Sequence, residues 1–196
     1  MLHRHLLVGA AFAAAQFLPA QTTNTEAGPV APMRLSPDGT RLFVADTLGG
    51  RLAVFDLRNP SAPFLLAEIP CGLEPVSVQA RTRDEVWVAC QLSDSVAIVD
   101  VAARRVVDTL RVVDEPSDIV FAGGKAFVTA GASDRVSVFD AVTRAPLGTV
   151  SIFGKDPRAL AVSPDGTRVY AVVQRSGNGT TVLPAGVQAP PPPTNG

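Results

Sequence analysis

The sequence contains very little histidine. Its only two histidines are His3 and His5, which lie within the first five residues. Most hydrolytic triads, zinc sites and haem ligation schemes use an imidazole ring. The rest of the chain therefore largely excludes these mechanisms, and we predict no catalytic residue and no metal site in it.

Long hydrophobic runs are also missing. No segment reaches the roughly 20 apolar residues that a membrane-spanning helix needs. The apolar stretch at residues 6–15 is short, follows the basic start His3-Arg4-His5, and precedes small residues that end near Ala20. This is the three-part layout of a secretory signal peptide. We predict that residues 1–20 are a signal peptide and that the mature chain is periplasmic or secreted, without a membrane span.

The sequence also has no excess of positive or negative charge. The chain carries 17 Lys and Arg against 18 Asp and Glu, which gives a formal net charge of −1, and Lys125 and Lys155 are its only lysines. The basic residues are scattered rather than clustered. This balance gives no reason to expect a nucleic acid or an anionic membrane as a partner. We also predict no cofactor.

Cysteine occurs only at Cys71 and Cys90. In an exported protein an even pair is a candidate disulfide, and a pair of buried free thiols is the alternative. The spacing matches neither a CxxC redox motif nor a haem-attachment motif. The repeat described next makes the disulfide geometrically feasible, because it places both residues at the same face of the fold.

What the sequence does contain is an internal repeat. Four segments align from residues 30, 75, 116 and 157, so their starts lie 45, 41 and 41 residues apart. A period near 40 residues that is built from short strands is typical of the four-stranded blades of a β-propeller. We therefore predict an all-β fold of propeller blades.

Each unit has a predicted second strand in which apolar residues alternate around an aromatic side chain. These strands are residues 41–45, 85–89, 125–129 and 168–172, and their aromatic residues are Phe43, Trp87, Phe127 and Tyr170. A turn and a predicted third strand follow in the first three units. The third strands are residues 52–56, 96–100 and 136–140, and they end in Asp56, Asp100 and Asp140.

The turns before the second strands support this register. Ser36-Pro37-Asp38-Gly39 and Ser163-Pro164-Asp165-Gly166 place proline and glycine where a hairpin turn favours them. Gly123-Gly124 does the same in two residues, whereas Thr82-Arg83-Asp84 has no glycine. We predict a hairpin at all four positions.

These motifs resemble the YVTN β-propeller repeat. The resemblance rests on the strand Leu42-Phe43-Val44-Ala45, on the SPDGTR turns at residues 36–41 and 163–168, and on the aspartates that end the third strands. It covers residues 30–183 and implies an exported, YncE-like propeller. The tetrapeptide itself departs from the family pattern, since it reads FVAD, WVAC, FVTA and YAVV here.

The alignment divides the chain as follows. Residues 21–29 are a predicted flexible segment, residues 30–74, 75–115 and 116–156 are three complete blades, residues 157–183 are a partial fourth blade, and residues 184–196 are a proline-rich linker or insertion. Closed propellers have four to eight blades. We therefore expect an incomplete ring, which either further blades of a longer gene product or the association of copies would close.

Several residues admit a structural and a functional interpretation. Asp56, Asp100 and Asp140 are favoured as caps of the turns that follow their strands, with a ring of metal ligands as the alternative. The phenylalanines of the second strands, Phe43 and Phe127, and Trp87 are favoured as core between blades over a stacking platform for a ligand. Asn178-Gly179-Thr180 fits a glycosylation sequon, but a turn at residues 176–179 is favoured.

A ligand-binding site is predicted where the innermost strands enter the channel mouth. By the alignment, the residues there are Arg34, Ser77, Asp118 and Arg158. Such a group could orient an anionic or polar ligand.

Two classes of function remain. The favoured one is an exported scaffold, not an enzyme, that binds a protein, a surface polymer or a small ligand. The alternative is the propeller part of an enzyme or electron-transfer assembly, lactonase-like or cytochrome-linked, whose catalytic residues lie outside this chain. Fold analogy alone supports the alternative.

Overall fold

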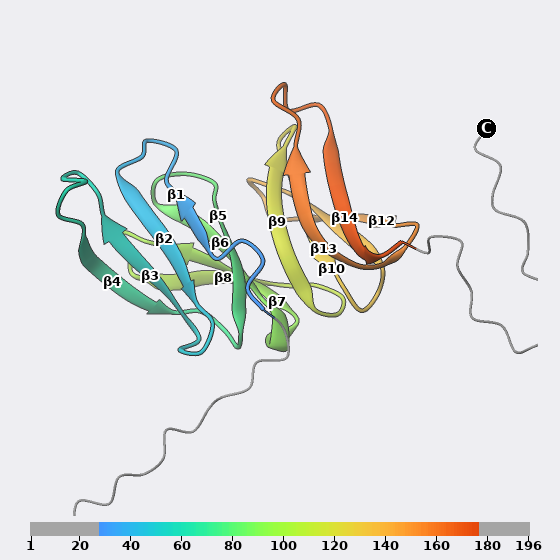
Figure 1. The fold of residues 1–196 in the computed structure, drawn as a ribbon, viewed down its shortest axis with the longest axis horizontal. Helices are drawn as coiled ribbons and strands as arrows, with labels where there is room; N and C mark the ends of the chain where they lie inside the picture. The colour runs from blue at the N-terminus through green and yellow to red at the C-terminus, as the bar shows by residue number, and fades with distance from the viewer. Residues whose placement is uncertain (1–27, 177–196) are drawn as a thin grey trace, which may run out of the picture.

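The computed structural model describes residues 28–176 and places fourteen strands in them. Three sheets have four strands each, and one sheet has two (Figure 1). The first sheet consists of β1 (Met33–Leu35), β2 (Arg41–Asp46), β3 (Arg51–Asp56) and β4 (Phe64–Pro70). The second consists of β5 (Pro75–Ala80), β6 (Glu85–Cys90), β7 (Ser95–Asp100) and β8 (Arg105–Arg111). The third consists of β9 (Pro116–Ala122), β10 (Lys125–Ala130), β11 (Arg135–Asp140) and β12 (Pro146–Ser151), and the last of β13 (Lys155–Val162) and β14 (Val169–Arg175).

Every sheet is an antiparallel meander in which each strand pairs with the next one along the chain. The first strands of neighbouring sheets contact one another, and a parallel bridge joins Ala31 to Ser77. The fourth strands lie at the periphery, as β4 and β12 do in Figure 1. This is the arrangement of propeller blades. The predicted fold is confirmed: three complete blades and a partial fourth form a ring that is open within the described residues.

The two SPDG turns have nearly the same bonds. Gly39 has a positive φ of 69°, which glycine adopts without strain, and its N–H donates to the Ser36 carbonyl at 2.9 Å. The Ser36 hydroxyl donates to Asp38 at 2.6 Å, and hydrogen bonds from Ser36 and Thr40 lower the pKa of Asp38 to about 2. The second blade has no SPDG turn. There the Thr82 hydroxyl oxygen accepts the N–H of Glu85 at 2.9 Å and stabilises the turn before β6. All four predicted hairpins are present.

The aspartates that end the third strands cap the following turns, as predicted. Asp56 accepts the N–H of Arg58, Asp100 accepts that of Ala103 and Asp140 accepts that of Val142, each at 2.9 Å. Hydrogen bonds from Thr143 and Val142 lower the pKa of Asp140 below its usual value.

The core lies between the blades, because the side chains of each strand alternate between two neighbouring sheets. Phe43 of the first blade packs with Val88 of the second in one cluster, and Trp87 of the second packs with Ile119 of the third in another. All four side chains are fully buried. The predicted core role of Phe43 and Trp87 is therefore confirmed.

Several predictions fall outside the described residues. These are the signal peptide at residues 1–20, the turn and sequon at Asn178, and the proline-rich segment at residues 184–196. No helix within residues 28–176 is long and apolar enough to cross a membrane.

Candidate functional site

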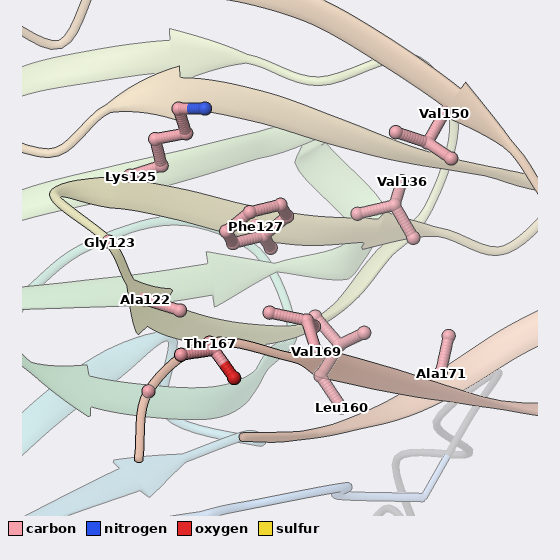
Figure 2. Close-up of a pocket in the computed structure, with 11 residues that line it drawn as sticks. Ala122, Gly123, Lys125, Phe127, Val136, Val150, Leu160, Thr167, Val169 and Ala171 are labelled. Carbon is pink, nitrogen blue, oxygen red and sulfur yellow. The ribbon is translucent and has the colours of Figure 1, made fainter. Parts of the chain in front are cut away.

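An open cleft separates the third blade from the partial fourth one. Its volume is about 400 Å³. The residues that line it come from all four strands of the third blade and from both strands of the fourth, and Figure 2 shows how they lie. The third blade contributes Phe127, Val136 and Val150, and the fourth contributes Leu160, Val169 and Ala171.

The cleft is open because, within residues 28–176, the fourth blade presents only two strands to the third. Val150 is paired with Val136 across β11 and β12, as Ile69 is paired with Leu52 across β3 and β4. Ile69 is 1% exposed because the second blade covers it, whereas Val150 is 51% exposed. Among the described residues, nothing therefore covers the outer half of the third blade, whereas the other two blade junctions are closed.

The lining of the cleft is mostly apolar and includes one cationic side chain. Apolar side chains dominate the lining, and Lys125 is the one charged residue among those that line it. Thr167, in the turn before β14, adds a hydroxyl (Figure 2). Pockets with mostly apolar walls and few polar groups are typical of binding sites for small molecules or side chains. This cleft can take up an apolar group that carries a negative charge at one end.

The structure brings two of the four predicted channel-mouth residues into direct contact. Ser77 of β5 donates its hydroxyl proton to Asp118 of β9 at 2.7 Å, and the N–H of Leu160 in β13 donates to the same carboxylate at 2.8 Å. Both Ser77 and Asp118 are buried, with 0% and 3% exposure. Asp118 thereby ties together the innermost strands of three blades, and its oxygens face protein donors.

The two predicted arginines take no part in the hydrogen bonds of this buried pair. Arg34 is exposed on β1, and Arg158 on β13 forms an ion pair with Asp156 at 2.9 Å. Within residues 28–176 no hydrogen bond or ion pair joins either arginine to Ser77 or Asp118. Ligand binding at these four residues stays a prediction.

Sequence reasoning missed a repeated acid at the start of each later blade, just before β5 and β9 and at the second residue of β13. Glu74, Glu115 and Asp156 are each followed by a buried proline, and they have positive φ angles of 49°, 52° and 58°. Asp94 accepts the N–H of Glu115 at 2.9 Å and Asp134 accepts that of Asp156 at 3.0 Å. The loop between the second and third strands thus holds the connector to the next blade. The recurring acid-proline pair in the aligned sequence could have revealed it.

A second polar group surrounds the indole of the buried Trp87. Glu85 accepts the indole N–H at 2.8 Å and a bidentate pair of bonds from Arg81 at 2.6 and 2.7 Å. Arg144 of the third blade lies 3.5 Å from the same carboxylate. Burial on its own would raise the pKa of Glu85, but the bonds from Arg81 and Trp87 outweigh it and lower the pKa.

Cys71 and Cys90 are neighbours at the junction of the first two blades. Both are thiols in the structure, and Cys90 is buried. A hydrogen bond between the two thiols lowers the pKa of Cys71 and raises that of Cys90. A methyl group on Gly72 would lie 2.8 Å from the Cys90 sulfur, so the chain approaches Cys90 closely only because residue 72 is glycine. The disulfide stays a prediction, which counting alkylated thiols by mass would test.

No group of three or more His, Cys, Asp or Glu is placed to hold a metal ion within residues 28–176. No protein-family model matches the sequence, and none of the curated proteins does.

Solved structures of other proteins share the fold. Kuenenia stuttgartiensis hydrazine synthase superposes with a TM-score of 0.70 at 24% identity, over 83% of this chain and 47% of that one. A candidate 6-phosphogluconolactonase from Bacteroides uniformis gives 0.64 at 19% identity, over 77% and 52%. A functionally unknown protein from Desulfotomaculum acetoxidans gives 0.62 at 13%, over 74% and 51%.

These similarities establish a propeller fold for the described residues. The chain spans about half the length of the solved structures it resembles. The identities are too low to transfer an activity, and the resemblance to the YVTN repeat stays a prediction.

Proposed function

We propose that this protein is an exported YVTN-type propeller that acts as a binding scaffold, and that the cleft between its third and fourth blades is a site where it takes up a ligand or partner. The observation that carries this proposal is the open apolar cleft itself. The other two blade junctions are closed by packed side chains, whereas this one presents an uncovered wall with Lys125 at its edge. Uncovered apolar surface of this kind marks binding sites.

A fluorescent probe of matching chemistry tests the cleft. Anilinonaphthalene sulfonate combines an apolar ring system with one negative charge. We expect it to bind the purified mature chain saturably. The Val150→Asp variant places a like charge on the uncovered wall and should raise the dissociation constant at least about tenfold, which is about 1.4 kcal/mol.

Two variants serve as controls for this titration. Val142→Asp adds the same charge to an exposed turn outside the cleft, and it should leave binding unchanged. Lys125→Gln should weaken binding by a smaller factor than Val150→Asp, because it removes only the cation. Equal binding by the wild type and Val150→Asp would refute the proposed site.

The export part of the proposal rests on the layout of residues 1–20. A fusion of residues 1–29 to alkaline phosphatase, which is active only outside the cytoplasm, should show phosphatase activity. Replacing the apolar residues 6–8 with aspartate should abolish that activity. An active fusion after this replacement would contradict the assignment of a signal peptide.

A second candidate is the propeller part of an enzyme assembly. The fold similarity to hydrazine synthase and to the candidate 6-phosphogluconolactonase favours it. A lactonase assay with 6-phosphogluconolactone separates the two candidates when it is run on the protein isolated from its own cells together with any subunits that accompany it. A scaffold should leave the lactone to hydrolyse at the rate seen in buffer, whereas a faster, saturable rate would favour the enzyme.

A further inference from the structure

The two cysteines of the chain meet at the junction of the first two blades. Cys71 begins the connector from β4 to β5, which spans residues 71–74, and it is partly exposed. Cys90 is the last residue of β6 and is 0% exposed. A hydrogen bond joins the two thiols. Neither the proposed binding cleft nor the predicted channel mouth involves this pair.

The next junction has the same two positions without sulfur. Val112 is the counterpart of Cys71, because the backbone N–H of each donates at 3.0 Å to the carbonyl of the residue just before the third strand of the preceding blade. Ala130 ends β10 as Cys90 ends β6. Val112 and Ala130 are both buried in the apolar cluster between the second and third blades. Packing at these positions therefore requires no sulfur, and it does not account for a cysteine at both of them in the first junction.

Glycine at position 72 allows the first connector to lie close to Cys90. A side-chain carbon added to Gly72 would lie 2.8 Å from both the β carbon and the sulfur of Cys90, which is closer than such atoms pack. The counterpart of Gly72 in the next connector is Val113, whose side chain is 54% exposed and therefore has room there. The glycine is thus needed at the junction that carries the two thiols, and not at the one that lacks them.

The two thiols differ in how readily they react. The hydrogen bond from Cys90 lowers the pKa of the Cys71 thiol, and it outweighs burial and the charge of Asp46, which both raise that pKa. The same contact, together with burial, raises the pKa of Cys90. The thiolate, rather than the thiol, is the nucleophile in reactions of cysteine. Cys71 is therefore the thiol that a molecule in solution can reach, whereas Cys90 can react only with a group already attached to Cys71.

We propose that Cys71 and Cys90 form a reversible site for thiol–disulfide exchange, in which Cys71 attacks and Cys90 resolves. The oxidant is a disulfide that reaches the surface, and glutathione disulfide represents its chemistry. The Cys71 thiolate attacks one sulfur of that disulfide, so its S–S bond breaks, a first glutathione leaves as a thiolate and a mixed disulfide remains on Cys71. Cys90 then gives up its proton and attacks the Cys71 sulfur, which releases the second glutathione.

The exchange leaves a covalent bond between the first two blades. Two protein thiols lose two electrons and two protons and become one disulfide, and one glutathione disulfide gains them and becomes two glutathione thiols. The new bond ties the connector at residues 71–74 to the end of β6, in addition to the apolar core that the two blades share. This site goes beyond the proposed binding function. Its readout is the oxidation state of two thiols, which does not depend on dye binding in the cleft.

Alkylation of the free thiols, followed by measurement of the intact mass, tests the proposal. The purified protein is reduced, freed of reductant and incubated with glutathione disulfide. It is then treated with N-ethylmaleimide in denaturant, which blocks every remaining thiol. We expect the reduced protein to take up two maleimides, and the oxidised protein to take up none and to carry no glutathione. Excess dithiothreitol should restore both thiols, as a reversible site requires.

Two variants that copy the next junction separate the roles of the two thiols. Cys90→Ala introduces the residue that ends β10, and Cys71→Val introduces the residue found at position 112, so each variant carries a side chain that this fold already packs there. We expect Cys90→Ala to stop at the mixed disulfide and to carry one glutathione. Cys71→Val should take up glutathione at least about a hundredfold more slowly, because its remaining thiol is buried and protonated. Circular dichroism spectra equal to that of the wild type would show that both variants fold.

Three results would overturn the proposal. One is a wild type that keeps two alkylatable thiols in excess glutathione disulfide. Another is a wild type that ends with glutathione on its cysteines and no disulfide between them, which would indicate two independent thiols. The third is a Cys71→Val variant that reacts with glutathione disulfide as fast as Cys90→Ala, because Cys90 would then not depend on Cys71.

Discussion

The Asp118 side chain connects three blades of the fold. Its carboxylate accepts bonds from Ser77 and from the N–H of Leu160, in the blades on either side of its own. The Asp118→Ala variant leaves both buried donors without a partner and should lower the free energy of unfolding by about 3 kcal/mol. Urea denaturation measures this change. Arg83→Ala, which removes a surface ion pair with Asp38, should cost less than about 1 kcal/mol.

Equal losses in the two variants would show that Asp118 does not brace the inner strands. If Asp118→Ala instead kept full stability, a ligand-binding role at the channel mouth would regain support. The choice between the two roles of Asp118 therefore depends on a single stability measurement.

Glu85 should give the protein a defined sensitivity to acid. Its pKa is lower in the folded state than in the unfolded one, so its contribution to stability is complete above the ordinary carboxyl pKa and is lost as the pH falls through the lowered value. Wild type and Glu85→Gln should therefore differ in urea midpoint at neutral pH and converge in acid. A difference that stays constant with pH would contradict this assignment.

Some of these side chains could be predicted from the sequence and others could not. The capping role of Asp56, Asp100 and Asp140 follows from local turn chemistry, which acts within a few residues. The burial of Ser77 and Asp118 depends on the packing of strands that are about 40 residues apart in the sequence. The alignment predicts that these strands are neighbours, but it does not show how closely they pack. The sequence analysis therefore predicted a ligand site from the position of these residues near the channel, whereas the structure shows that Ser77 and Asp118 form a hydrogen bond between two blades.

The SPDG turn is the element that fixes the first hairpin. Gly39 has a φ of 69°, and no atom lies within 4 Å of where an added side-chain carbon would be. The Gly39→Ala variant should therefore lose about 1 kcal/mol from backbone strain alone. Gly39→Asn should cost less, because asparagine tolerates the left-handed region. Equal losses in a thermal melt would mean that the turn does not require this conformation.

Strands differ in how well the sequence predicts them. In the first three blades the second and third strands are predicted to within one residue, since a turn motif precedes the second strand and alternation with an aromatic residue marks it, whereas β14 extends three residues beyond its predicted end. The fourth strands share no such motif: β4, β8 and β12 read FLLAEIP, RVVDTLR and PLGTVS. They lie at the periphery, where one uniform core pattern is not required, and all of β12 is exposed.

At the level of the whole molecule, stability should fall from the middle blade toward the ends. The second blade is covered on both faces, whereas the first and fourth are each covered on one. Amide hydrogen exchange should therefore be slowest in β6 and β7 and fastest in β1 and β14. Uniform exchange across all blades would indicate a closed, evenly packed ring instead.

The open ring also explains why the cleft was not predicted from the sequence. The alignment showed a partial fourth blade, but the uncovered wall depends on which strands of the third blade that partial blade leaves bare. Val150 has the same character as buried residues in other blades, so nothing local to it marks a binding surface. Its exposure comes only from the arrangement of the blades.

Hydrogen exchange with and without saturating anilinonaphthalene sulfonate tests most directly whether the cleft is the binding site. The account predicts slower exchange in β10, β11 and β14, whose side chains line the cleft, and no change in β6 and β7. The same experiment on Val150→Asp should show no protection. Protection confined to the first two blades, or none at all in the wild type, would contradict the assignment of this cleft as the binding site.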